Sequence, residues 1–287
     1  MKIIFSRKGF DSGYGKIPSP ILEDGTLLSL PIPSTVDNDT MASLNAHDFD
    51  LDGLLHDLSR GKHSINMRIH HDPELLNHRG AHQKWRPALG QTGAAHGHLA
   101  KQGVGTGDVF LFFGWFRHVE RVGGRWRYIP TAANLHVLFG WLEVDEVLPI
   151  VLERERCLAA YPSIANHPHV ASPAHYSHRN NHLYMGAERS RFVPGLHGGG
   201  HFSRFSPQLQ LTAPGGTRTL WNLPEWMAPQ QGRRALTYHE DPARWTLGSG
   251  SALMQSVGKG QEFVLHCEDY PEAPSWLSGL ITSHSAS

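Results

Sequence analysis

The stretch DVFLFFGWFRHVE, residues 108–120, is the most strongly strand-forming segment of the chain, and LHVLFGWLEVDEVLPIV follows it at residues 135–151. Both stretches are rich in aromatic and β-branched residues, which favour β-strands. The glycine turn VGGR and the short aromatic run WRYIP lie between them, at residues 122–130. Strands that follow one another across such a turn predict an antiparallel hairpin.

Outside this hairpin the sequence predicts more short strands than helices. The predicted strands are MKIIF, SPIL, HLYMGAE, PQLQLT and QEFVLHC, and the predicted helices are FDLDGLLHDLSRG at 49–61 and TGAAHGHLAKQG at 92–103. A fully parallel sheet would require a regular alternation of strands and helices, which the sequence lacks. We therefore predict one domain over residues 1–287 with an α+β, predominantly β fold and a few short helices.

Composition excludes several classes of protein. The chain has 287 residues, zero formal net charge, two cysteines and 21 histidines. Two cysteines exclude a disulfide scaffold and an all-cysteine zinc site, and zero net charge gives no global attraction to polyanions. The longest apolar run, residues 109–116, is too short to cross a bilayer, so we expect no membrane association and a cytoplasmic location. The histidines make metal binding a hypothesis to weigh.

The N-terminal loop SRKGFDSGYGKIPSP, residues 6–20, has the residue types of a nucleotide-binding loop. Its glycines allow tight turns and close approach of the backbone to a ligand. Basic side chains could hold a phosphate, Asp11 could accept a proton, and an aromatic ring could stack on a base. The predicted substrate-binding residues here are Arg7, Lys8, Ser12 and Tyr14. The alternative is a surface turn in which Asp11 and Ser12 cap the local backbone.

His70 and Asp72 form a His-x-Asp pair, and residues two apart in an extended chain point to the same side. With a distant histidine they could complete a two-histidine, one-carboxylate triad for Fe(II) or another divalent ion. Candidates for the third ligand are His98, His136 and His169. The simpler alternative is that Asp72 begins a turn and that His70 forms local hydrogen bonds.

Three other features have both a functional and a structural interpretation. Trp115 and Trp141 could line an aromatic cage for a base, or belong to the core. The arginines and aromatics of residues 117–128 could form a platform for single strands, or a charged hairpin tip. The histidine-rich stretch NHPHVASPAHYSHRNNH, residues 166–182, is more typical of a solvated loop than of a dedicated metal site.

Glycines and apolar residues around positions 100–150 resemble the core of PUA-like barrels. The similar features are GVGTGDVFLFF, with its Gly-Asp turn into an apolar strand, and a later strand with glycine in its middle. This resemblance implies a curved sheet or barrel element. Fold alone does not give function.

Several stretches occur in the order expected of the nucleotide modification associated domain family of the third type, found in bacteria and phages. They are residues 1–34, HHDPEL, GQTGAAHGHLAKQGVGTGDVFLFFGWF, HVLFGWLEV, HPH, LWNLPEW and GQEFVL. Where that family tends to show His-Leu-Asp-Pro, this chain has His70-His71-Asp72-Pro73. The resemblance implies a part in DNA base modification, a nucleotide or DNA base as ligand, and other DNA-modification proteins as partners.

Together these features predict a polar pocket formed by the N-terminal loop and the HHDP segment. In it Asp11 and Asp72 are the predicted catalytic carboxylates, Trp115 a stacking residue, and His70, Asp72 and His98 the predicted metal ligands. Three functions compete: a nucleotide-binding component of base modification, a non-catalytic reader of modified bases, and a metal-dependent base-modifying oxygenase of the non-haem iron type. A scaffold that binds neither nucleotide nor metal would instead expose an apolar patch.

Overall fold

The computed structural model describes residues 1–44, 49–77, 84–230, 232–258 and 262–285. Strand residues outnumber helix residues, as the sequence predicted. The strands are β1 (Lys2–Arg7), β2 (Ser19–Ile21), β3 (Ala88–Gln91), β4 (Val109–Val122), β5 (Arg125–Tyr128), β6 (Leu135–Leu148), β7 (His182–Gly186), β8 (Gly199–His201), β9 (Leu220–Pro224), β10 (Trp245–Leu247), β11 (Ser251–Gln255) and β12 (Glu262–His266). The α-helices are α1 (Leu51–Ser59), α2 (Gly93–Lys101), α3 (Ile150–Ala160), α4 (Pro168–Ala171), α5 (Pro173–Tyr176) and α6 (Ala273–His284).

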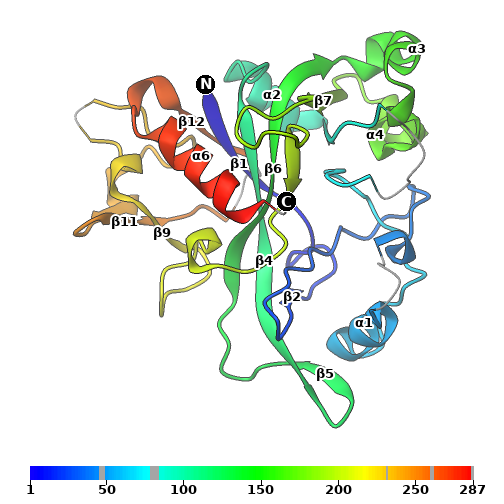
Figure 1. The fold of residues 1–287 in the computed structure, drawn as a ribbon, viewed down its shortest axis with the longest axis horizontal. Helices are drawn as coiled ribbons and strands as arrows, with labels where there is room; N and C mark the ends of the chain where they lie inside the picture. The colour runs from blue at the N-terminus through cyan, green and yellow to red at the C-terminus, as the bar shows by residue number, and fades with distance from the viewer. Residues whose placement is uncertain (45–48, 78–83, 231, 259–261, 286–287) are drawn as a thin grey trace.

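Two long strands, β4 and β6, run antiparallel through the middle of the molecule (Figure 1). Val109 pairs with Glu143 at one end and Phe116 with Leu135 at the other, with a bulge after Phe112. The short strand β5 folds back on the far end of β4 across a turn in which two glycines adopt positive φ angles. The predicted hairpin is therefore confirmed.

The main sheet is mixed and open. Its strand order is β12-β1-β4-β6-β7-β3, with β2, β5 and β8 paired along the long strands, and β10-β11-β9 form a separate small sheet. Strand β1 runs parallel to β4, whereas β12 and β6 pair antiparallel with their neighbours. The described strands form open sheets and close no barrel, so of the two predicted alternatives the barrel is excluded.

The two predicted helices are present, and one predicted strand is not. Helix α1 ends at Arg60 in the left-handed conformation, and α2 carries the histidines of the TGAAHGHLAKQG stretch. In PQLQLT the residues Pro207–Leu209 form a 3-10 helix, because Pro207 begins it and the Ser206 side chain accepts a hydrogen bond from Gln208 N. No helix in the described part of the chain has the length and apolarity needed to cross a lipid bilayer.

Three hydrophobic clusters hold the fold. The largest includes residues from Ile3 to Ile281 and packs α6 on the sheet, and Trp141 is fully buried within it. Trp141 is thus a core residue and no part of an aromatic cage. A second cluster joins α1 to the N-terminal segment and includes Ile69, and a third joins α3 to β7 and includes Val170. Since His70 follows Ile69 and His169 precedes Val170, the two smaller cores position the polar residues described below.

Candidate functional site

A cavity of about 340 Å³ brings together polar residues from distant parts of the chain. It is lined by Arg7, Lys8, Gly9, Asp11, Tyr14, residues 32–37, His70, Asp72, residues 90–92, His169 and His175. The N-terminal loop and the HHDP segment therefore line one cavity, as predicted. Ser12, Trp115 and His98 do not line it.

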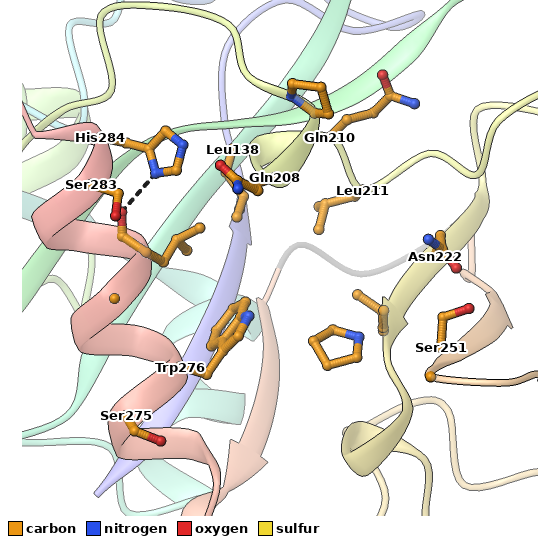
Figure 2. Close-up of a pocket in the computed structure, with 16 residues that line it drawn as sticks. Leu138, Gln208, Gln210, Leu211, Asn222, Ser251, Ser275, Trp276, Ser283 and His284 are labelled. Carbon is orange, nitrogen blue, oxygen red and sulfur yellow. Dashed lines mark hydrogen bonds between the residues drawn. The ribbon is translucent and has the colours of Figure 1, made fainter.

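A larger cavity, of about 510 Å³, lies between α6 and the β9–β11 ribbon (Figure 2). Its lining is a mixture of leucine, proline, serine and amide side chains, with Trp276 on the α6 side. The one titratable side chain in this lining, His284, donates from its ring to the Leu280 carbonyl within its own helix. The smaller cavity is therefore the better candidate for chemistry despite its size.

Asp72 is the central carboxylate of the smaller cavity, and its side chain is 2% exposed. Oδ1 accepts a hydrogen bond from Gly90 N at 2.7 Å, and Oδ2 lies 3.5 Å from Lys8 Nζ and 4.0 Å from His70 Nε2. Burial alone would raise the pKa of Asp72, but the Lys8 ammonium and His167, whose Nε2 lies 3.3 Å from Oδ1, hold it well below its usual range. Asp72 is consequently ionised.

The His70 ring lies between two carboxylates. Its Nδ1 is 2.9 Å from Asp37 Oδ2, while Nε2 faces Asp72. Asp37 also accepts from Ser34 Oγ at 2.7 Å and lies 3.1 Å from His175 Nε2. Burial opposes ionisation of Asp37, but the hydrogen bonds from His175, His70 and Ser34 hold its pKa far below the usual range. An ionised Asp37 accepts the hydrogen bond that His70 Nδ1 donates, which directs Nε2 toward Asp72.

His169 is held in the same manner by an amide. Its Nδ1 lies 2.7 Å from Asn181 Oδ1, and Asn181 Nδ2 donates back to the His169 carbonyl. Because the amide oxygen can only accept, Nδ1 carries the proton and Nε2 is left with its lone pair. Burial lowers the pKa of His169 to about 3, so the ring is neutral at ordinary pH. A Cβ built on Gly90 would lie 2.1 Å from this ring, so only glycine leaves room for it.

These residues form a set of potential metal ligands. One ligand atom each of His70, Asp72 and His169 lies within 4.8 Å of the other two, and Asp37, His70 and His175 form a second such group. Two histidines and one carboxylate on one side of a metal are the ligands of a facial triad. Outer partners such as Asp37 and Asn181, which fix the histidine tautomers, are typical of built metal sites.

Lys8 links this group to a second buried carboxylate. Its Nζ lies 3.9 Å from Glu262 Oε1, which also accepts a hydrogen bond from Gln91. Burial raises the pKa of Glu262 to about 7, with the Asp72 charge adding to the effect and Lys8 and Ser6 opposing it. The Lys8 ammonium thus lies between two buried carboxylates at the wall of the cavity.

The other predicted residues of the loop lie at or outside the cavity. Asp11 Oδ1 accepts from Gly13 N at 2.7 Å and Tyr14 N at 2.6 Å, which is the capping role of the alternative interpretation. Asp11 nevertheless lines the cavity together with the exposed Tyr14, while Ser12 is exposed beyond it. Trp115 donates to Asn134 Oδ1 at 2.8 Å outside the cavity lining.

The third ligand predicted at His98 is not brought to His70 and Asp72. Helix α2 directs His98 to Thr237, 3.1 Å away, whereas His96 stacks on His182 at a ring distance of 3.8 Å. Because residues two apart on a helix face different directions, the two rings diverge as predicted. His136 is buried elsewhere and accepts a hydrogen bond from Trp221, so His169 is the candidate that joins the pair.

Sequence reasoning did not identify Asp37, His175, Asn181, Gln91 and Glu262. The histidine-rich stretch was predicted to be a solvated loop, but α4 and α5 bury His169 and bring His175 to Asp37. The available signals were the HPH and GQEFVL stretches, which contain His169 and Glu262 and which carried the family resemblance.

Comparison with known proteins supports that resemblance. The family model of nucleotide modification associated domain 3 matches residues 2–266. Searches of curated proteins and of solved structures found no match. The family match includes every residue of the candidate site. The chain therefore belongs to the nucleotide modification associated domain 3 family.

Proposed function

We propose that this chain is a metal-dependent enzyme of nucleotide base modification, with the metal bound by His70, Asp72 and His169. The observation that supports the proposal best is the pair of histidine rings whose outer nitrogens are held by Asp37 and Asn181. Their inner nitrogens and Asp72 Oδ2 are then available to one divalent cation. Family membership supports a nucleotide as the ligand.

Such a triad leaves part of the coordination sphere of the metal open to water, oxygen or substrate. Fe(II) would suit oxidation of a base, and another divalent ion would suit hydrolysis. A cavity of about 340 Å³ is at the small end of ligand sites, so it fits one nucleotide and not a duplex. A base within DNA would therefore have to leave the stack to reach it.

The charges of the cavity are consistent with this proposal. In the absence of a cation, Lys8 provides the positive charge that compensates Asp72. A metal near Oδ2 would repel the Lys8 ammonium, and Glu262, 3.9 Å from Nζ, is the alternative partner for it. Asp11 and Tyr14, which line the same cavity, are the proposed substrate contacts.

Elemental analysis of protein purified without an affinity tag tests the proposal. We expect about one iron, manganese or zinc ion per wild-type chain, directly or after anaerobic reconstitution, and less than about a tenth of that in a His70→Ala, Asp72→Ala double variant. His98→Ala is the matched control, because it removes an imidazole outside the site and should leave the metal content unchanged.

Two results would contradict the proposal. One is a wild-type protein that remains free of metal after reconstitution with each of the three ions. The other is a folded double variant that keeps its metal, which would place the ion elsewhere. Circular dichroism of each variant separates loss of metal from loss of fold.

A further inference from the structure

Two guanidinium groups lie near each other on one face of β4, and one of them, that of Arg7, lines the cavity. Arg7 lines the cavity and its Cζ lies 5.7 Å from the centre of the Phe113 ring, while Arg218 Cζ lies 4.5 Å from the centre of the Trp115 ring. Because Phe113 and Trp115 are two residues apart on a strand, their rings lie on the same side of the sheet. Arg7 and Arg218 are therefore neighbours.

The backbone and aromatic contacts fix these two side chains without neutralising them. Arg7 donates to the carbonyls of Gly258 at 3.1 Å and Val257 at 3.3 Å, and its Nε is buried without a partner among the described residues. Trp115, under Arg218, is held by its hydrogen bond to Asn134.

No carboxylate of the described residues lies within ion-pair distance of either arginine. Burial lowers the pKa of Arg7, and the charge of Arg218 lowers it further. Asp11 raises the pKa of both arginines, but its Oδ1 already accepts two backbone hydrogen bonds. The result is a local excess of positive charge in a chain whose net charge is zero.

We propose that Arg218, together with Arg7, binds the phosphate group of the nucleotide whose base enters the cavity. This inference rests on the proposed function and names its substrate class, a phosphate-bearing nucleotide. Guanidinium groups bind phosphate oxygens through two parallel hydrogen bonds, which a nucleoside cannot form. Trp115 then acts as a positioning residue, because its ring supports Arg218. The phosphate can belong to a free nucleotide or to a single strand of DNA.

Calorimetric titrations with metal-loaded protein test this subsite. The probes are the four deoxynucleosides, their 5′-monophosphates and a short single-stranded oligodeoxynucleotide. We expect at least one monophosphate or the oligonucleotide to bind about tenfold or more tightly than the corresponding nucleoside, and Arg218→Gln to remove that difference. Arg218→Lys should keep part of this difference in affinity, because lysine keeps the positive charge but cannot form the two parallel hydrogen bonds of a guanidinium group. Preference for the oligonucleotide over every monophosphate would identify a DNA strand as the source of the phosphate.

Arg121→Gln is the matched control for the monophosphate titrations, because Arg121 also lies over a tryptophan, Trp126, but at the hairpin tip. Equal binding of nucleosides and monophosphates, or an unchanged preference in a folded Arg218→Gln variant, would overturn the phosphate subsite and leave the proposed function standing. If no base-containing probe bound to metal-loaded wild-type protein, the nucleotide site itself would be refuted along with the subsite.

Discussion

Replacing Gly90 by alanine is expected to destabilise the protein by about 2–4 kcal/mol and to lower its metal content about tenfold or more. The added Cβ would lie 2.1 Å from Cγ and Cδ2 of His169, which real side chains do not tolerate. His169 is buried and its Nδ1 is held by Asn181 Oδ1, so its ring cannot move without breaking that hydrogen bond. Urea unfolding and elemental analysis measure the two effects.

Gly97 provides the control for this substitution within the same stretch of sequence. It lies in helix α2, is exposed, and a Cβ built on it meets no atom within 4 Å. Gly97→Ala should therefore stabilise the helix by about 0.5–1 kcal/mol and leave the metal content unchanged.

A double-mutant cycle identifies the cause of the Gly90 effect. If the clash with the imidazole is responsible, Gly90→Ala should leave the free energy of unfolding almost unchanged in a His169→Ala background. An equal loss of unfolding free energy in the wild-type and His169→Ala backgrounds would mean that the Cβ disturbs strand β3 itself. The assigned position of His169 would then be wrong.

The hairpin of β4 and β6 was predictable because its signals are local. Aromatic and β-branched residues fill both strands, and glycines mark the turn between β4 and β5. The parallel pairing of β1 with β4 was not predictable in the same way, because Ile3 and Val109 are far apart in the chain. Nothing in MKIIF indicates its partner strand.

The candidate site was predictable to a similar extent. The spacing of His70 and Asp72 placed two candidate ligands on one side of an extended segment, and the structure brings them together. The third ligand depends on which distant segment packs against Gly90, and no local pattern determines this. Histidine-rich sequence alone does not distinguish a solvated loop from rings held by Asp37 and Asn181. That distinction depends on tertiary contacts between residues more than 100 positions apart, such as His175 and Asp37, as well as on contacts between residues close in sequence, such as His169 and Asn181.

Sequence reasoning also did not identify Arg218, for a different reason. Its sequence context, GGTRTL, has no motif, and its proposed role rests only on the contact with Trp115 and the nearness of Arg7. Sequence reasoning assigned Trp115 to stacking on a base, whereas the structure places an arginine over that ring. Functional arginines of this kind become visible when their neighbours are known, because an unpaired charge is a property of the surroundings.

Mild acid is expected to destabilise the protein strongly. Four buried histidines have pKa values lowered by burial: His96 to about 4, His169 to about 3, His239 to about 4, and His136 well below the ordinary value. In the unfolded chain these rings bind protons below about pH 6.5, whereas in the folded chain they stay neutral. The unfolded state thus binds more protons, and the free energy of unfolding falls as the pH decreases from about 6.5 toward 4.

Each such histidine contributes a loss of up to about 2 kcal/mol at pH 5, which together is comparable with the whole stability of many domains. Asp37 and Asp72, whose pKa values are lowered, stabilise the fold above the ordinary carboxyl range and lose that contribution at still lower pH. Urea unfolding between pH 7 and pH 5, with a chelator present to exclude any contribution from metal, measures the effect of the histidines apart from that of Asp37 and Asp72, which falls at lower pH. Glu262, whose pKa burial raises to about 7, acts in the opposite direction in this window, because its folded form takes up a proton that the unfolded chain does not.

His239 is the most informative single position for this measurement, because it is fully buried and lies outside the proposed metal site. Its Nδ1 donates to the Thr237 carbonyl and its Nε2 accepts from Val257 N, so protonation would remove an accepted hydrogen bond. His239→Gln should reduce the stability difference between pH 7 and pH 5 by up to about 2 kcal/mol. His56→Gln, on the exposed surface of α1, should not change it. A wild-type stability that stays constant from pH 7 to pH 5 would contradict the assignment of these four rings as neutral and buried.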